Sequence, residues 1–370
     1  MQDPQQPGSV STSLHGVLHK ALEAQGGWLP FDRFMSLALY APGLGYYARD
    51  SRQFGSLPSS GSDFVTAPEL SPRFGAALAV QVGQALQACG STEVIEFGAG
   101  SGALAAQLLG ALGARVERYT IVELSAALRE RQQATLAAHA GKVRWLDAWP
   151  QALHGVVVGN EVLDAMPVQL LSFDGHAWME RGVAWHEGAW TWADRPTALR
   201  PPLAGQLVPG TVTEVHPQAE AFIRSLAQRL VRGAAFFIDY GFPEAEYYHP
   251  QRTGGTLMCH RAHQADDNPL VDVGEKDITA HVDFTGVALA AQESGLDVLG
   301  YTSQAHFLIN CGLLDQLQGA GPREVAAAQK LLTEHEMGEL FKVIGLARDC
   351  DDSLLLDPVG FARGDRSHTL

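Results

Sequence analysis

The sequence has little of what marks a membrane-spanning, exported or disulfide-built protein. No apolar run approaches the roughly 20 residues that cross a bilayer. The opening MQDPQQPGSVST contains neither a basic nor a hydrophobic segment, so we expect no secretory signal. The four cysteines stand singly, without a C-x-x-C pair, which argues against a disulfide framework. These absences favour a cytoplasmic protein with reduced thiols and no stable membrane insertion.

Positive charge is also scarce. The 26 Lys and Arg residues face 41 Asp and Glu residues, which gives a net charge of -15. Non-specific binding to nucleic acid needs the opposite balance, so we expect no nucleic-acid partner. The composition is 46% hydrophobic and 18% charged, typical of a globular protein, and 370 residues suffice for one elaborated domain or two domains.

Strand-like and helix-like segments alternate through the middle of the chain. The strand candidates 93–97, 119–124 and 143–146 are separated by helical patterns, which predicts an α/β fold with a parallel, Rossmann-like sheet. The rhythm then breaks at alternating, Trp-rich hairpins with turns at Asp174-Gly175 and Glu187-Gly188. We divide the chain into an N-terminal helical segment and lid (1–75), a first half of the sheet domain (76–164), a β-rich insertion (165–215) and a second half (216–370) with a substrate-side loop (251–280).

The stretch EFGAGSGAL places three glycines between a strand and a helix. Gly98, Gly100 and Gly102 let the backbone approach a ligand closely and direct free N–H groups toward it. The pattern also fits the dinucleotide fingerprint G-x-G-x-x-G/A. The glycines alone therefore leave a nicotinamide or flavin enzyme open beside other nucleotide-like ligands.

Acidic residues at the ends of the strands favour S-adenosylmethionine. Glu96, two residues before Gly98, would repel a diphosphate but suits a ligand with a cationic amino group. This acid-x-G-x-G-x-G arrangement resembles motif I of class I methyltransferases. The resemblance implies that Glu123 accepts hydrogen bonds from both ribose hydroxyls and that Asp147 meets the adenine amino group. The competing interpretation of Glu96 is a solvated loop acid.

Longer stretches resemble one methyltransferase family, the MidA family, whose mitochondrial members are complex I assembly factors and protein arginine methyltransferases. The resemblance covers about residues 31 to 286 in order. It implies a seven-stranded Rossmann-like methyltransferase sheet, S-adenosylmethionine as methyl donor and an arginine-containing loop of a partner protein, such as a complex I subunit, as acceptor. The chain looks like a bacterial, cytoplasmic relative. The matching stretches are FMSLALYAPGLGYY, DFVTAPELSPRFG, EFGAGSG, YTIVELSAALRERQ, GNEVLDAMPV, FIDYGF and GTLMCHRAHQADDNPLVDVGEKDITAHVDFT.

Carboxylates that grip a guanidinium from two sides would orient it for methyl transfer. NEVLDAMP follows the fourth strand, where class I methyltransferases place residues that face the transferred methyl. There Glu161 and Asp164 lie three residues apart, and TEVHP adds Glu214 from the insertion. By analogy with the two glutamates of known arginine methyltransferases, we expect Glu161 to work with Glu214 or Asp164. The bland alternatives are a helix cap for Asp164 and a surface acid for Glu214.

Four further polar residues complete the predicted site. Asn160 begins NEVLDAMP and is a candidate cofactor contact, and Tyr240, at the end of a buried strand, is a candidate substrate contact. TAPELSP looks like a lid over the cofactor, with Glu69 and Ser71 as its polar contacts. The alternatives are that Tyr240 packs and that Ser71 only caps the helix that begins at Pro72.

CHRAHQADDNP raises the question of zinc. Cys259 and His260 are adjacent, which is poor geometry for joint ligation, and methyl transfer from a sulfonium needs no metal. We therefore predict no metal and give His263 and His281 hydrogen-bond or packing roles. Two other functions stay open, a small-molecule O- or N-methyltransferase and an assembly factor that binds S-adenosylmethionine without turnover.

Overall fold

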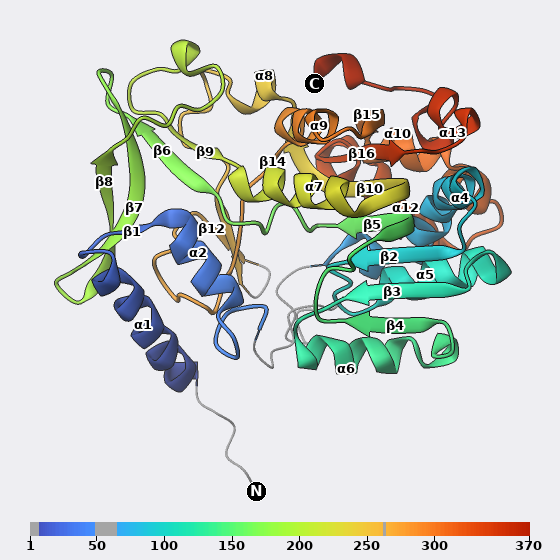
Figure 1. Ribbon diagram of the computed structural model, residues 1–370, viewed down its shortest axis with the longest axis horizontal. Coiled ribbons are helices and arrows are strands. Elements are labelled where there is room, and N and C mark those ends of the chain that lie inside the picture. Colours follow the sequence, from blue (N-terminus) through green and yellow to red (C-terminus); the bar gives the residue numbers. More distant parts are fainter. Residues whose placement is uncertain (1–6, 49–64, 262–263) are drawn as a thin grey trace, which may run out of the picture. The chain divides into compact units, whose positions relative to one another are not determined.

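The computed structural model describes residues 7–48, 65–261 and 264–370 and divides into two compact units (Figure 1). The sheet unit consists of Val65–Leu163, Glu220–Pro243 and Phe284–Leu370. The accessory unit consists of the described residues of 1–64, 164–219 and 244–283. The N-terminal segment, the insertion and the loop after residue 250, which the sequence presents as separate segments, thus belong to one unit.

The sheet unit contains a row of seven strands in the order β15-β16-β10-β5-β2-β3-β4. The five strands from β10 to β4 are parallel, while β16 runs antiparallel to both of its neighbours. This is the Rossmann-like methyltransferase sheet that the sequence predicts. The strands are β2 (Glu93–Phe97), β3 (Arg118–Val122), β4 (Val143–Leu146), β5 (Leu153–Asn160), β10 (Leu230–Phe242), β15 (Asp297–Ser303) and β16 (Phe341–Arg348).

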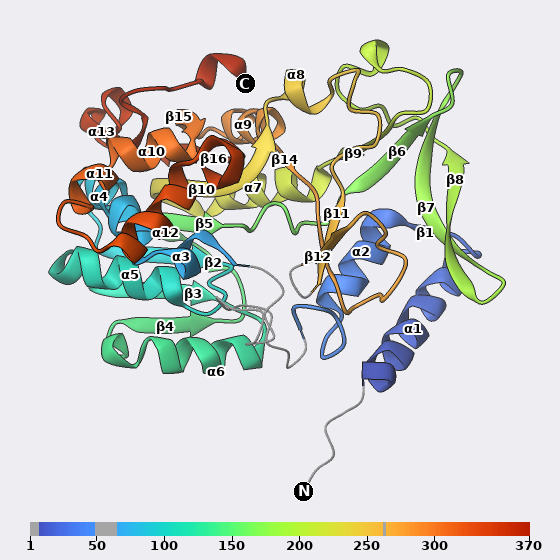
Figure 2. The same ribbon diagram turned by 180° about the vertical axis from the view of Figure 1, so that it is seen from behind.

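Helices cover both faces of this sheet because successive residues of its buried strands point to opposite sides (Figures 1 and 2). Phe236 of β10 joins the apolar core under α4 and α5, whereas Phe237 contacts Phe222 of α7 on the other face. The helices of the unit are α3 (Ala67–Leu70), α4 (Pro72–Cys89), α5 (Ala103–Leu112), α6 (Ala126–Thr135), α7 (Pro217–Arg229, whose first turn belongs to the accessory unit), α9 (Phe284–Glu293), α10 (Gln304–Asn310), α11 (Leu313–Gln316), α12 (Pro322–Leu332) and α13 (Asp352–Leu356).

The accessory unit is built on an antiparallel sheet with the order β1-β7-β6-β9, to which β8 adds beside β7. The hairpin turns lie where the sequence predicts them, and Glu187 and Gly188 both take the positive φ that tight hairpin turns require. The elements are α1 (Pro7–Ala24), β1 (Leu29–Pro30), α2 (Phe31–Tyr40), β6 (Gln169–Phe173), β7 (Trp178–His186), β8 (Ala189–Pro196), β9 (Val212–Val215) and α8 (Glu244–Tyr247).

The segment 251–280, predicted as a substrate-side loop, contains strands of its own. It contributes β11 (Met258–Arg261) and β12 (Gln264–Asp266), which form a small antiparallel sheet with β13 (Asp277–Thr279). The buried Cys259 and Ile278 pair across this sheet, so a short apolar pattern hidden among polar residues directs the fold. The last strand of the unit is β14 (Val282–Asp283).

The described residues contain neither a helix that could span a membrane nor a group of metal ligands. None of their helices combines the length and the apolar character that crossing a bilayer requires. No three His, Cys, Asp or Glu side chains in this part of the chain are grouped so that they could hold a metal ion. His263, which the sequence raises as a possible ligand, lies outside the described residues.

Candidate active site

The predicted cofactor residues of the sheet unit follow neighbouring parallel strands. Phe97 pairs with Gly159 on one side and with Val122 on the other, and Val122 pairs with Leu146. Because parallel strands end at a common edge, the residues after these strands lie along one carboxyl edge of the sheet, where open α/β sheets bind ligands. In strand order across the edge they are Asn160 and Glu161, Gly98, Glu123 and Asp147.

The glycine loop adopts a conformation that other residues disfavour. Gly98, Gly100 and Gly102 have φ values of +67°, +50° and +84°. A Cβ atom on Gly98 would lie 2.7 Å from Cγ2 of Val162, so glycine is also needed for space. Helix α5 begins directly after the loop at Ala103, which directs its free N–H groups toward this edge.

Glu96 is a buried acid rather than a solvated one. Its side chain is only 2% exposed and accepts a 2.7 Å hydrogen bond from the Tyr119 hydroxyl. Burial, opposed by this hydrogen bond and reinforced by the charge of Glu123, raises the pKa of Glu96 to about 7. A cation bound nearby would favour the ionised form of Glu96. The sequence predicts such a cation, the amino group of the ligand, beside this position.

Glu123 is held by its own loop and by a buried glutamine. Its carboxylate accepts hydrogen bonds from the Ser125 N–H (2.8 Å) and from Nε2 of Gln132 (2.9 Å), and burial raises its pKa. Gln132 also donates to the Gly100 carbonyl oxygen at 3.0 Å and accepts from Nε1 of Trp145 at 2.9 Å. One side chain of α6 thus connects the glycine loop, Glu123 and β4.

An apolar side chain stands exposed beside this acid. Leu124, which follows Glu123, is 80% exposed, although burying a leucine side chain is worth about 1.5–3 kcal/mol. Asp147 follows β4 and is exposed. Two acids and a projecting leucine therefore occupy the end of the edge where the sequence places the ribose and adenine.

Asn160 and Glu161 show unused bonding capacity and backbone strain. Asn160 donates from Nδ2 to Oε1 of Glu161 at 2.9 Å, while its own Oδ1 is buried and has no partner among the described residues. Glu161 has φ of +54°, the left-handed region that costs a residue with a side chain of its size, and its N–H bonds to the Ile238 carbonyl oxygen. An orphaned acceptor beside a strained acid is the pattern expected of a ligand site.

The carboxylate of Glu214 is occupied by hydrogen-bond donors of its own unit. It is fully buried in the accessory unit, where it accepts hydrogen bonds from the Tyr247 hydroxyl (2.9 Å), the Thr256 N–H (2.8 Å) and the Leu257 N–H (3.0 Å). Burial raises its pKa. It is not the surface acid that the sequence offers as the bland alternative, and its carboxylate is engaged by internal donors.

The remaining predicted residues are divided between the units. Asp164 is buried in the accessory unit, where its carbonyl oxygen accepts the Ala280 N–H at 3.0 Å. Tyr240 lies near the end of β10 in the sheet unit and packs edge-on against Phe341, with 5.3 Å between the ring centroids. The structure therefore brings Asn160 and Glu161 together within one unit, whereas Asp164 and Glu214 belong to the other.

The lid segment is tied to the glycine loop. Ser71 caps α4, because its hydroxyl accepts the Arg73 N–H at 3.3 Å and Pro72 takes the first helical position as predicted. Two residues earlier, Glu69 of α3 accepts a hydrogen bond from the Ser101 hydroxyl of the glycine loop. Glu69 thus contacts the glycine loop, whereas Ser71 caps the helix that follows the lid.

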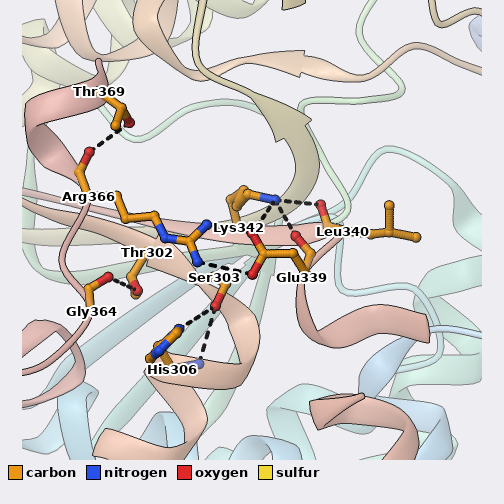
Figure 3. Close-up of polar contacts among 9 residues, drawn as sticks. All are labelled: Thr302, Ser303, His306, Glu339, Leu340, Lys342, Gly364, Arg366 and Thr369. Atoms are coloured by element: carbon orange, nitrogen blue, oxygen red, sulfur yellow. Dashed lines mark hydrogen bonds and ion pairs between the residues drawn. The ribbon is translucent and has the colours of Figure 1, made fainter. Parts of the chain in front are cut away.

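At the other end of the edge, charged side chains satisfy one another (Figure 3). Arg366, from the C-terminal segment, bonds to both carboxylate oxygens of Glu339, and Lys342 of β16 contacts the same residue. Ser303, at the end of β15, caps α10 by accepting the His306 N–H. This cluster closes the β15–β16 corner with internal bonds and resembles structural packing more than a binding site.

The residues on this edge fit S-adenosylmethionine. The glycine loop and the start of α5 offer N–H donors, Glu123 and Asp147 offer acceptors for hydroxyl and amino groups, and Leu124 offers an apolar surface. The orphaned Oδ1 of Asn160 is an acceptor for an ammonium group. A diphosphate would instead meet the carboxylates of Glu96 and Glu123.

Two residues of this edge, Gln132 and Leu124, carry no signal in the sequence, and a third, Asp239, has a position at a strand end but no predicted role. Gln132 stands among ordinary helix formers, and Leu124 is one leucine among many, so neither has a signal beyond its place in the family stretch YTIVELSAALRERQ. Asp239 lies within FIDYGF without an assigned role, yet it accepts the N–H groups of Val162 and Leu163. Their contacts become visible only when distant segments come together.

Known proteins resemble this chain over most of its length. The model of an S-adenosyl-L-methionine-dependent methyltransferase family matches residues 77–302. The mitochondrial protein arginine methyltransferase NDUFAF7 of Danio rerio is 26% identical, over 92% of this chain and 89% of its own length. Its counterpart from Mus musculus is 28% identical, over 90% and 82% of the two chains.

A solved structure extends the match to the whole chain. A protein from Burkholderia thailandensis, crystallised with S-adenosyl-homocysteine, is 50% identical and superimposes with a TM-score of 0.94 over 100% of both chains. S-adenosyl-homocysteine is what remains of S-adenosylmethionine after methyl transfer, so S-adenosylmethionine is the methyl donor of this enzyme. The chain belongs to the MidA family of S-adenosylmethionine-dependent methyltransferases.

Proposed function

We propose that this enzyme methylates an arginine side chain of a partner protein. The observation that carries the proposal is the strained, acidic turn after β5, in which Glu161 follows an orphaned acceptor on Asn160. The relatives named as protein arginine methyltransferases, which match along most of both chains, support it.

Methyl transfer to an arginine side chain needs a carboxylate at the position of Glu161. When bound, S-adenosylmethionine supplies a methyl group on a sulfonium. As a guanidinium nitrogen bonds to the methyl carbon, the carbon–sulfur bond breaks and its electron pair stays on sulfur. The product is a methylguanidinium, a neutral thioether and one proton. The Glu161 carboxylate grips the guanidinium, holds the attacking nitrogen in line and lies ready to accept the proton.

Glu214 is no longer our candidate for the second carboxylate of the predicted clamp. Glu214 is saturated by the donors of its own unit, so we assign it a structural role in holding the loop at residues 256–257. Asp164 and Tyr240 stay candidate substrate contacts. For the cofactor, we retain Glu96, Glu123, Asp147 and Asn160, and we assign Ser71 to the helix cap.

The acceptor is, in this proposal, an exposed arginine-containing loop of a protein. A subunit of respiratory complex I is our first candidate, because the MidA family includes complex I assembly factors. The net charge of -15 favours the approach of a basic loop over an acidic one. We place the reaction in the cytoplasm.

The proposal is tested with S-adenosylmethionine labelled in its methyl group. The purified enzyme is incubated with extract from a strain that lacks its gene, and labelled proteins are separated and mapped by mass spectrometry. We expect label in a discrete protein band, on an arginine, and no such band with Glu161→Gln.

Two results would contradict the proposal. Label that appears only in small metabolites would identify a small-molecule methyltransferase. A parent enzyme that binds S-adenosylhomocysteine but transfers no label to any component would favour an assembly factor without turnover.

A further inference from the structure

Asp239 is the buried acid that the reaction chemistry leaves without a task. It lies near the end of β10, in the sheet unit, and only 1% of its surface is exposed. Its Oδ2 accepts the N–H groups of Val162 at 3.1 Å and Leu163 at 2.8 Å, and its Oδ1 accepts the Tyr240 N–H at 3.0 Å. A carboxylate that accepts several backbone N–H groups is a strong local anchor.

The two anchored N–H groups belong to the residues directly after Glu161. The N–H of Glu161 itself bonds to the Ile238 carbonyl oxygen at 2.9 Å, which continues the pairing of β5 with β10. The left-handed backbone of Glu161 therefore lies between two consecutive residues of β10 that hold it from both sides. Such a conformation persists only where its surroundings fix it.

The same turn packs against the methyl-donor loop. Cγ2 of Val162 lies 2.7 Å from the position that a Cβ atom on Gly98 would take. The same methyl group also lies beside Gly159. Holding Val162 in place therefore also sets the distance between the acidic turn and the glycine loop. A small shift of this turn would move the Glu161 carboxylate relative to the donor methyl.

A buried cation stands opposite Asp239 in the sheet. Asp239 and Lys342 are paired residues of the antiparallel strands β10 and β16, so their side chains leave the sheet on the same face with Cβ atoms about 5 Å apart. Lys342 is itself almost fully buried and is held by Glu339, which Arg366 grips in turn (Figure 3). The cross-strand partner of Asp239 is thus a buried lysine whose charge is met by Glu339.

We infer that Asp239 is a positioning residue, which locks the strained turn after β5 so that Glu161 faces the methyl acceptor. The inference rests on the proposed role of Glu161 and adds the device that holds it. Asp239 touches neither substrate nor donor in this scheme, and acts only through the N–H groups of Val162 and Leu163.

The test compares Asp239→Ala and Asp239→Asn with the parent and with Glu161→Gln. In Asp239→Ala we expect amide exchange at residues 162 and 163 to rise at least about tenfold, with turnover about 100-fold lower, because misplacing a reacting group by about 1 Å costs that much. We expect the dissociation constant of S-adenosylhomocysteine to change less than about threefold, below 1 kcal/mol. Asp239→Asn keeps an oxygen for both N–H groups and should restore most of the turnover.

The double variant Asp239→Ala with Glu161→Gln should be no slower than Glu161→Gln alone, because both changes disable the same group. Asp365→Ala is the matched control. Asp365 accepts the N–H groups of Tyr301 and Ser367 in the same unit, yet belongs to the C-terminal segment. Its variant should keep the parent's turnover.

The inference is overturned if Asp239→Ala keeps near-parental turnover, if its effect multiplies with that of Glu161→Gln, or if the exchange of residues 162 and 163 is unchanged. If Asp239→Ala does not fold, Asp239→Asn decides, since loss of turnover with protected amides would exclude the anchor role. If the parent methylates no protein, the proposed function fails, while the exchange measurement still decides whether Asp239 anchors the turn.

Discussion

Two acidic sites, one in each unit, differ in how their hydrogen-bonding capacity is met. In the accessory unit, Glu214 is surrounded by a hydroxyl and two backbone N–H groups, so its bonding capacity is met from within. In the sheet unit, the turn at Asn160 and Glu161 keeps an unpartnered buried oxygen and a left-handed backbone. A carboxylate whose hydrogen-bonding capacity is fully met stabilises the fold. An unpartnered acceptor beside a strained backbone gains its partner only when a ligand binds. The proposed substrate role of Glu161 and the structural role of Glu214 rest on this difference.

The largest expected effect comes from Glu161→Gln. We expect methyl transfer to fall about 1,000-fold, within the range for a positioned acid–base group, because the amide neither stabilises the cation nor accepts the proton. The affinity for S-adenosylhomocysteine and the melting temperature should stay near the parent's. Radiolabel transfer, calorimetric titration and thermal unfolding measure the three quantities.

Glu187→Gln is the matched control for this change. Glu187 is also a glutamate with positive φ, +49°, but it lies in the exposed hairpin turn of the accessory unit and is 85% exposed. Its variant should transfer methyl groups at the parental rate. Equal losses in the two variants would show that backbone strain, rather than the carboxylate of Glu161, explains the effect.

A stability effect is expected on the other side of the comparison. Glu214→Ala removes the acceptor of two N–H groups and one of the two partners of the Tyr247 hydroxyl, and should lower the free energy of unfolding by about 3 kcal/mol. Glu214→Gln keeps an oxygen for the N–H groups and should stay within about 1 kcal/mol of the parent. Urea unfolding measures both. If Glu214→Gln instead folds normally and transfers no methyl groups, Glu214 acts on substrate and the comparison fails.

The pH dependence of stability sharpens the contrast within the sheet unit. The pKa of Glu96 is raised from 4.5 to about 7, so the stability it contributes as a buried neutral acid is fully present below pH 4.5 and is lost as pH rises through 7. The full span is on the order of 3 kcal/mol. Glu96→Gln stays neutral, so its stability should gain on the parent's between pH 5 and pH 8. A constant difference in urea unfolding at the two pH values would contradict this.

Much of this comparison is invisible in the sequence. The strand–glycine–helix pattern predicts the sheet and its donor loop because strand and helix periods are local, and the acids at strand ends predict which ligand the loop holds. The saturation of Glu214 depends on residues 33 to 43 positions away in the chain, and the anchoring by Asp239 joins residues about 77 positions apart. No local pattern records such pairs, so the sequence does not distinguish an acid whose bonding capacity is met internally from one proposed to bind substrate.

Gln132 shows the same limit and gives the smallest expected effect. Its amide joins the Gly100 carbonyl oxygen to Glu123, and the family stretch contains it without marking it as polar and buried. Gln132→Leu should weaken S-adenosylhomocysteine binding about tenfold, the value of one well-placed hydrogen bond, because Glu123 loses a donor and the loop loses its brace. Gln133→Leu, one position along α6, is the control and should bind as the parent does. Calorimetric titration decides, and unchanged binding in Gln132→Leu would mean that the glycine loop and Glu123 hold their places without this connection.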